Sequence, residues 1–126
     1  MDTLNLQPNY QKIININSNQ VFAFPIKDGY RLVNSADILY CKAEGNYTQV
    51  FLTNGSNLLI SRKLKQTAAS LENEWFLRID QSYLVNMHHV EVYLRKSGGQ
   101  LVMTNGINLP ISKHYKEQVL QLFKIV

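Results

Sequence analysis

The stretch Asp37-Ile38-Leu39-Tyr40-Cys41-Lys42-Ala43-Glu44-Gly45-Asn46-Tyr47 decides the fold class. Its continuous apolar run at residues 38–41 predicts a strand that is buried on both faces. The next segment alternates as a strand with one buried face does, setting Thr48, Val50 and Leu52 against Gln49 and Phe51. Two adjacent strand patterns indicate a domain that is mainly β.

Tight-turn dipeptides recur between the apolar stretches: Asp28-Gly29, Asn54-Gly55, Gly98-Gly99 and Asn105-Gly106. Such pairs supply the positive φ angles that two-residue hairpin turns require. Four of these signals favour antiparallel hairpins over βαβ units. The tripeptide Thr-Asn-Gly occurs at 53–55 and again at 104–106, which we interpret as repeated turn chemistry and not as a duplicated domain.

Residues 88–95 show the most regular alternation in the chain. It predicts a strand with Val90, Val92 and Leu94 on one face. The other face would then carry His89, Glu91, Tyr93 and Arg95.

Two segments have helical spacing instead. In 62–72 the apolar residues recur at i, i+4 and i+7, and 113–126 carries a wider stripe of Tyr115, Val119, Leu122, Phe123 and Val126. Ser61 and Ser112 stand where N-caps belong. The sequence therefore predicts two helices, the second of which closes the fold.

The starts of both predicted helices are basic, with Arg62-Lys63-x-Lys65 at one and Lys113-His114-x-Lys116 at the other. A helix N-terminus has a partial positive charge and prefers acidic residues in its first turn. A bound phosphate would remove this conflict, because free N–H groups at helix starts bind anions. We therefore expect contacts with a phosphate backbone.

Composition sets the wider limits. A chain of 126 residues suits one domain, and its net charge of +4 permits a polyanionic partner without requiring one. Residues 1–20 are polar and rich in Asn and Gln, so we interpret them as an N-terminal arm before a domain at 21–126. No secretory signal or membrane-length apolar run is present, so we expect a cytoplasmic protein without membrane insertion.

Enzyme motifs are absent: the sequence contains no phosphate-binding glycine loop and no nucleophile elbow. Adjacent His88 and His89 would point to opposite faces of a strand, which makes a poor metal pair. Cys41 lies within a buried-looking strand and is expected to be an inert thiol. We therefore predict no catalysis, no metal and no cofactor.

Three segments together resemble the LytTR DNA-binding domain of bacterial response regulators. Residues 37–47 are similar to its D-I-x-Y-x-x-A-x-x-N-Y pattern, and residues 76–86 to F-x-R-[IV]-H-[RK]-S-[YF]-[LIV]-V-N. Residues 109–115 match L-P-[IV]-S-[RK]-x-Y. The motifs occur in the family's order, and the resemblance covers roughly residues 21–124.

The resemblance implies an elongated stack of small antiparallel sheets with two short helices. Loops of that stack, and no recognition helix, would enter successive major grooves of double-stranded DNA. By position, the base-contacting residues would be Asn46, Gln81 and Lys113, whose side chains suit adenine and guanine edges. The phosphate-contacting residues would be Tyr47, Arg62, Lys63, Ser82, Ser112, His114 and Lys116.

Other matching residues look structural. Core positions are expected at Ile38, Leu39, Ile79, Leu84 and Val85. Asn86 is expected to satisfy backbone groups at a turn, and Gly45 to adopt an unusual backbone angle.

The sequence departs from the family pattern at Asp80, where many members have His, and at Gln81, where Arg or Lys is common. An acid beside DNA repels phosphate unless it accepts from cytosine or pairs with a neighbour such as Arg78. The chain also has no room for the receiver domain of about 120 residues that family members usually carry. We therefore expect a stand-alone regulator or an excised domain.

The predicted function is sequence-specific binding of double-stranded DNA in bacterial transcription regulation, at sites that are direct repeats. Self-association or a separate sensor or regulator protein would control it. The alternatives are a protein-interaction module, or partner-dependent regulator, with weak DNA binding of its own, and a single-strand or RNA binder. The last would stack bases on Tyr40, Tyr47, Tyr83 and Tyr93.

Overall fold

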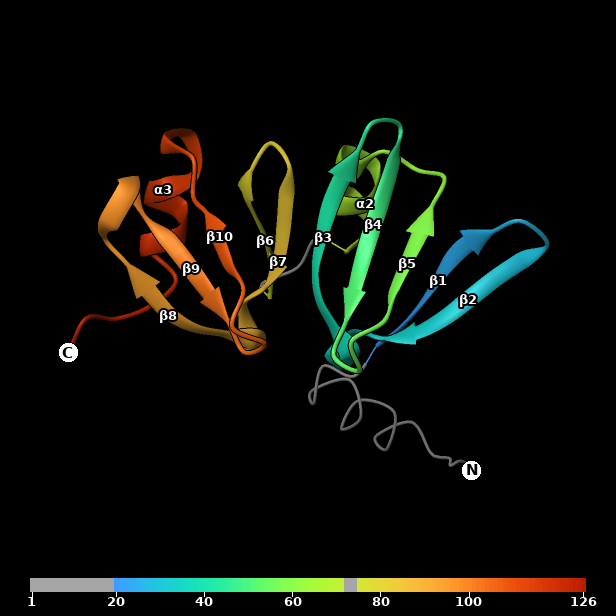
Figure 1. Ribbon diagram of the computed structural model, residues 1–126, viewed down its shortest axis with the longest axis horizontal. Helices are drawn as coiled ribbons and strands as arrows, with labels where there is room; N and C mark the ends of the chain where they lie inside the picture. Colours follow the sequence, from blue (N-terminus) through green and yellow to red (C-terminus); the bar gives the residue numbers. More distant parts are fainter. Residues whose placement is uncertain (1–19, 72–74) are drawn as a thin grey trace, which may run out of the picture. The chain divides into compact units, whose positions relative to one another are not determined.

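A computed structural model describes residues 20–71 and 75–126 (Figure 1). Most of the predicted arm at 1–20 lies outside these residues. The chain divides into two compact units, one ending at Asp37 and the other running from Ile38 to Val126. In the described residues the fold is mainly β, with several antiparallel sheets and two short α-helices, as predicted.

The first unit contains a hairpin of β1 (Val21–Ile26) and β2 (Gly29–Asn34), followed by the 3-10 turn η1 (Ser35–Asp37). Two hydrogen bonds join the two ends of this hairpin. The Ser35 N–H donates to the Gln20 carbonyl at 2.7 Å, and the Ser35 hydroxyl accepts the Gln20 N–H at 3.2 Å. The turn itself consists of Lys27 and Asp28, and Gly29 is a strand residue without a positive φ. The Asp28-Gly29 signal therefore marked a real hairpin but misplaced its turn by one residue.

The second unit is built around a five-stranded antiparallel sheet of order β5-β4-β3-β7-β6. Its centre is β3 (Ile38–Glu44), flanked by β4 (Tyr47–Leu52) and β7 (Tyr83–Asn86), with β5 (Asn57–Ile60) and β6 (Phe76–Asp80) at the edges. Residues 38–41 are all buried, which confirms the prediction of a strand covered on both faces. The predicted core residues Ile79, Leu84 and Val85 are buried as well.

Helix α2 (Leu64–Leu71) packs against this sheet through Leu64, Thr67, Ala68 and Leu71. It begins two residues later than predicted, and Ser61 is not its N-cap. The residue before the helix is Lys63, whose N–H donates to Oε1 of Gln66 at 3.3 Å while its carbonyl accepts the first helical bond from Thr67. Gln66 thus supplies one half of a capping box, which ties the helix start to Lys63.

A three-stranded sheet of order β10-β9-β8 contains β8 (Val90–Leu94), β9 (Gln100–Met103) and β10 (Asn108–Pro110). The 3-10 turn η2 (Met87–His89) precedes β8, and η3 (Lys96–Gly98) follows it. Apolar side chains of this sheet share one core cluster with the larger sheet, which includes Leu39, Tyr40, Leu101 and Met103.

The alternation predicted for 88–95 is wrong in two respects. Residues 88 and 89 belong to η2, and the β8–β9 register shifts between Val90 and Val92. Such a bulge inserts a residue and changes which side chains face the core. Consequently Val90 and Tyr93 both pack against the core cluster, whereas Val92 is 43% exposed.

Helix α3 (Lys113–Leu120) is also shorter than the predicted 113–126. Its stripe buries Val119 completely, but Leu122 and Phe123 are partly exposed and Val126 is fully exposed. The helix ends in a tightened turn in which the Leu122 N–H donates to the Val119 carbonyl at 3.1 Å. The apolar residues beyond it therefore do not form a continued core-facing stripe.

The repeated Thr-Asn-Gly tripeptides form two matching turns, in which Gly55 and Gly106 have φ of 89° and 88°. The Gly55 N–H donates to Leu52 and the Gly106 N–H to Met103, and each asparagine side chain accepts a backbone N–H two residues on. These are three-residue loops with a left-handed glycine, not the predicted two-residue turns. A two-residue turn does occur at Gly45-Asn46, where Gly45 has a φ of 63°, as expected for that glycine.

Burial of Cys41 produces a testable dependence of stability on pH. The thiol is inaccessible, and desolvation raises its pKa from 9.0 to about 12. The folded state therefore holds this proton more tightly than the unfolded state. We expect the Cys41 contribution to stability to be complete below pH 9 and to be lost as the pH rises toward 12, by at most about 1.4 kcal/mol per pH unit.

Urea unfolding of the wild type and Cys41→Ala between pH 8 and about 11 measures this effect as a pH-dependent difference in unfolding free energy. A Cys41 thiol that reacts with a thiol reagent in the native protein as fast as in urea would contradict the buried, inert state.

Candidate nucleic-acid interface

The β3–β4 turn presents the first predicted base-contacting residue. Asn46 is exposed at its tip, and Tyr47 beside it is 47% exposed. Gly45 makes the turn possible, because its positive φ lets β3 and β4 pair up to Glu44 and Tyr47. The turn is therefore short and anchored in the sheet, with the amide of Asn46 at its end.

The β6–β7 turn presents Gln81 and Ser82 and is held by its neighbours. Arg78 donates from Nη2 to the Gln81 carbonyl at 2.9 Å and from Nε to the Asp80 carbonyl at 3.2 Å. These bonds leave the amide of Gln81 exposed while holding its backbone. The guanidinium also lies over the ring of Tyr115 on α3, with its carbon 5.9 Å from the centroid.

Asp80 has a structural role in this turn. Its Oδ2 accepts the Ser82 N–H at 2.9 Å, which closes the turn on its own backbone. The bonds that Arg78 makes here go to the Asp80 and Gln81 carbonyl oxygens, so the guanidinium serves the same turn. The departure from the family pattern therefore stabilises the loop that carries Gln81.

The start of α3 presents Ser112, Lys113, His114 and Lys116. Ser112 is the N-cap residue, as predicted, but its side chain makes no capping bond. Its N–H donates to the Ile79 carbonyl at 2.9 Å, which joins this segment to the end of β6. Lys113 and His114 are exposed and Lys116 is half-buried, so the first turn is basic, as predicted.

The β5–α2 connection presents Arg62 and Lys63, both exposed. Two buried threonines hold its backbone: Thr48 Oγ1 donates to the Arg62 carbonyl at 2.7 Å, and Thr67 Oγ1 donates to the Lys63 carbonyl at 3.0 Å. Because Arg62 and Lys63 precede the helix, only Lys65 opposes the helix dipole of α2. The predicted conflict at this helix start is therefore smaller than at α3.

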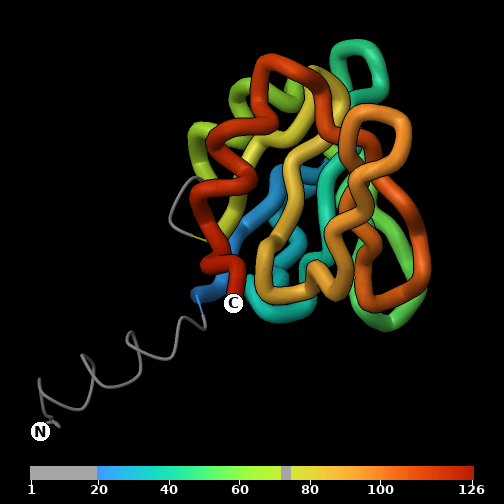
Figure 2. The backbone as a smooth tube through the Cα atoms, turned by 90° about the vertical axis from the view of Figure 1, so that its left-hand side faces the viewer, coloured from blue at the N-terminus to red at the C-terminus, as the bar shows by residue number. Residues whose placement is uncertain are grey.

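These four segments lie at one end of the strands of the second unit, and we call the surface that they form the basic edge. Thr48 links the β5–α2 connection to β4, the Ala43 N–H donates to the Ser82 carbonyl at 2.9 Å, and Ser112 bonds to Ile79. Both views place the β3–β4 turn, the β6–β7 turn and the start of α3 at the same end (Figures 1 and 2). All ten predicted contact residues belong to these segments.

A fifth segment that the resemblance did not assign adjoins the basic edge. The Ile111 N–H donates to the Gly99 carbonyl at 3.0 Å, so the η3 turn with exposed Arg95 and Lys96 lies beside the α3 start. The sequence showed this basic pair, but only the tertiary contact indicates that it belongs to the same surface.

Two of the described turns at the other end of the two sheets carry no charged residue. The β4–β5 turn contains Thr53, Asn54 and Gly55, and the β9–β10 turn contains Thr104, Asn105 and Gly106. Alternate turns of an antiparallel meander lie at opposite ends, so the described connections with Lys and Arg lie at the end opposite these two turns. Within the described residues, this separation defines the basic edge electrostatically.

Other predicted features have different outcomes. Tyr40 is buried, its pKa is raised by burial and by the nearby Tyr83, and it stacks on Phe51 at 4.5 Å; it is therefore core and not a platform for bases. Asn86 fulfils its predicted role, since its Nδ2 donates to the Ile38 carbonyl and its Oδ1 accepts the His88 N–H.

No group of three or more His, Cys, Asp and Glu side chains that could hold a metal occurs in the described ranges 20–71 and 75–126. His88 instead lies 3.9 Å from Trp75 between ring centroids. Among the same residues, no helix has the length and apolarity to cross a membrane.

The fold and the basic edge define a β-rich domain whose cationic loops can meet a polyanion. Comparison with known proteins agrees: the model of the LytTr DNA-binding domain matches residues 28–124. This chain therefore belongs to the LytTr DNA-binding domain family.

Two curated relatives are, by name, a transcriptional regulator and a sensory transduction protein. The chain is 35% identical over 75 residues to the CO-responsive transcriptional regulator RcoM of Rhodospirillum rubrum, covering 59% of this chain and 31% of that protein. It is 26% identical over 111 residues to the sensory transduction protein LytT of Bacillus cereus, covering 82% of this chain and 42% of that protein. The chain thus spans less than half the length of these relatives.

A solved structure confirms the fold. The LytTr DNA-binding domain of a putative methyl-accepting/DNA response regulator from Bacillus cereus superposes with a TM-score of 0.71 at 22% identity. The match covers 83% of this chain and 97% of that one.

Thr48 provides a test of how the basic edge is held. Thr48→Val keeps the shape of the side chain but leaves the Arg62 carbonyl without its 2.7 Å donor. We expect a loss of about 1 kcal/mol in unfolding free energy, because the partly buried Arg62 carbonyl loses its donor.

Chemical denaturation measures this loss. The matched control Thr53→Val, at an exposed turn position, should stay within about 0.5 kcal/mol of the wild type. Equal stability of the two variants would show that the Thr48 bond does not hold the connection.

Proposed function

We propose that this chain reads specific sequences of double-stranded DNA in transcription regulation, with the loops of the basic edge entering successive major grooves. The observation that carries the proposal is a separation within the described residues of the second unit: the connections with Arg and Lys lie at one end, and the two Thr-Asn-Gly turns at the other end carry no charge. Phosphate attraction supplies much of the affinity of such a surface.

Base reading is assigned to Asn46, Gln81 and Lys113. All three side chains are exposed at the ends of anchored segments. Asn and Gln can bond the N6 and N7 atoms of adenine, and Lys can donate to O6 and N7 of guanine. Because Arg78 and Asp80 already hold the Gln81 backbone, the loop loses little conformational entropy on binding.

Phosphate contacts are assigned to residues that flank the readers and set the register on the duplex. They are Tyr47, Arg62, Lys63, Ser82, Ser112, His114 and Lys116, joined by Arg95 and Lys96 of the η3 turn. At the start of α3, backbone N–H groups without a side-chain cap are suited to a phosphate oxygen. Such a contact would relieve the unfavourable placement of Lys113 and His114.

Enrichment from a random duplex pool at near-physiological salt tests the proposal directly. We expect one short motif, repeated about a helical turn apart if two copies bind a direct repeat. Binding without enrichment that fades smoothly with salt would reject sequence reading. It would favour an interaction module, or a regulator that needs a sensor or a second regulator protein to read DNA.

Gln81→Ala and Lys113→Ala test the assignment of the reading loops. Each should cost about 1–3 kcal/mol on the enriched site and relax specificity at one base position. Gln118→Ala on the exposed side of α3 is the matched control and should bind as the wild type does. Unchanged specificity in both variants would place the reading residues elsewhere.

Lys63→Ala tests the phosphate contacts through their salt dependence. Affinity should fall by a similar factor for specific and unrelated duplexes, and the slope of log K against log salt should shrink by about one. Lys124→Ala, which removes an exposed lysine beyond α3, is the control for net charge. A loss confined to the enriched sequence would instead make Lys63 a base reader.

A further inference from the structure

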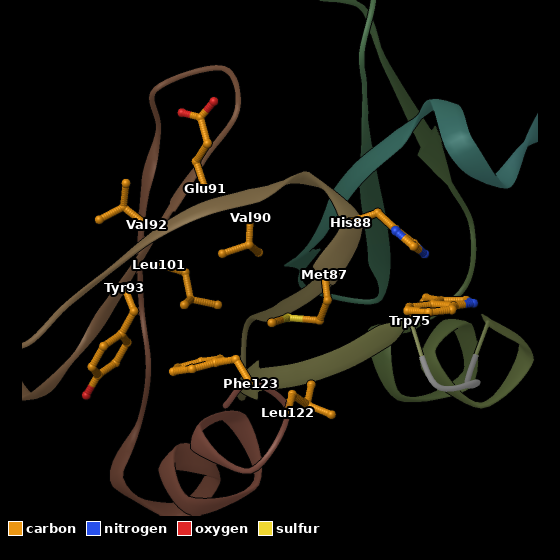
Figure 3. A pocket seen from close by; sticks show the side chains of 10 residues that line it. All are labelled: Trp75, Met87, His88, Val90, Glu91, Val92, Tyr93, Leu101, Leu122 and Phe123. Carbon is orange, nitrogen blue, oxygen red and sulfur yellow. The ribbon is translucent and has the colours of Figure 1, made fainter. Parts of the chain in front are cut away.

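A pocket of about 420 Å³ lies beside β8, and none of the predicted DNA contacts lines it. Its walls include the rings of Trp75, Tyr93 and Phe123 together with the apolar side chains of Met87, Leu101 and Leu122. Figure 3 shows Met87 and Leu101 beside the flat ring of Phe123, with Trp75 at one end. The ring centroids of Tyr93 and Phe123 are 5.8 Å apart.

The charges around this pocket are unusual for this chain. Its residues from 29 to 126 carry the whole net charge of +4, yet neither Lys nor Arg is among the described residues that line the pocket. Its one carboxylate, Glu91, is exposed at the rim and points away from the apolar floor in Figure 3. An anion would therefore be repelled at the rim and would find neither Lys nor Arg among the described lining residues, where His88 is the one basic side chain. Any charge would also lose hydration against the floor.

We propose that this pocket binds a small uncharged molecule with an aromatic body. The volume falls within the range of about 300–1,000 Å³ that ligand pockets occupy. Rings stack favourably against the faces and edges of Trp, Tyr and Phe. The bounded hollow between these rings fits one ring system, whereas a flat apolar face would suit a second protein surface.

The position of the pocket gives its ligand a route to the basic edge. Phe123 and Leu122 follow α3 directly, and the Leu122 and Gln121 N–H groups still donate into the last turn of the helix. Displacement of Phe123 therefore acts on one end of an eight-residue helix whose other end carries Lys113 and His114. The inference that a ligand alters DNA binding rests on the proposed function. The inference that the ligand acts on α3 does not rest on it.

The test uses two fluorescent probes that share a ring system. N-phenyl-1-naphthylamine is uncharged, and 8-anilinonaphthalene-1-sulfonate adds one sulfonate. We expect the uncharged probe to bind with one saturable site per chain and at least about fivefold more tightly than the sulfonate. Glu91→Gln should narrow that difference by tightening the binding of the sulfonate alone.

Leu122→Trp should fill the mouth and weaken binding of the uncharged probe by at least about tenfold. Leu122 is 46% exposed, so the fold should tolerate the change, which thermal unfolding checks. The matched control is Leu59→Trp on β5, where the leucine is 53% exposed and does not line the pocket. Leu59→Trp should bind the probe as the wild type does.

Three results would overturn the proposal: equal binding by wild type and Leu122→Trp, tighter binding of the sulfonate, or a wild-type dimer that Leu122→Trp dissociates. The dimer would make a second copy the occupant. Amide resonances of residues 113–116 report the link to α3 without DNA, and unchanged resonances at saturation would refute that link. Failure to enrich a DNA motif, by contrast, would reject the proposed function and leave probe binding intact.

Discussion

The structure of the second unit depends on the burial of β3 on both of its faces. Ile38, Leu39, Tyr40 and Cys41 cannot be covered by one layer, because side chains of a strand point to both sides of a sheet. Leu39 and Tyr40 belong to the cluster shared with the three-stranded sheet, while α2 packs against the same five-stranded sheet. Asn86 strengthens this arrangement, because its amide satisfies the buried Ile38 carbonyl at 3.0 Å.

The antiparallel order then determines where charge can gather. Successive turns of antiparallel strands lie at alternate ends of the sheet. A surface formed at one end therefore contains every second turn. The chain places Asn46, Gln81 and the basic segments on that end and places its two Thr-Asn-Gly turns on the other. With helices of only eight residues, about 12 Å long, loops held by buried atoms are the projecting parts of this surface.

The sequence predicted the elements whose signals are local. The apolar run at 38–41, the alternation in β4, and the asparagine at 86 that satisfies backbone groups at a turn all depend on neighbouring residues, and each is found. Turns also occur at Asn54-Gly55 and Asn105-Gly106, as three-residue loops and not as the predicted two-residue turns. The errors occur where a distant partner decides. The bulge at Val90–Val92 exists only in pairing with β9, and α3 ends where its stripe leaves the core.

The same distinction applies to the site. The resemblance assigned ten contact residues, and their joint placement on one edge follows from the sheet order and from the Ala43–Ser82 and Ser112–Ile79 bonds. The sequence could not place Arg95 and Lys96 beside them, because that proximity rests on the Gly99–Ile111 bond, between residues twelve positions apart. Nor could pattern alone say which cap begins α2, since Ser61 and Gln66 both offer an oxygen near its start.

Asp80 orders its own turn, although its negative charge opposes the charge of the surrounding basic edge. A carboxylate near phosphate weakens attraction, but its effect on a solvated surface is screened within about 8–10 Å. Its bond to the Ser82 N–H instead acts within the turn and is present before any partner arrives. Together with the two bonds from Arg78, it holds the backbone on either side of Gln81. In the proposed role of Gln81 as a base reader, this prior order reduces the conformational entropy that the loop loses on binding.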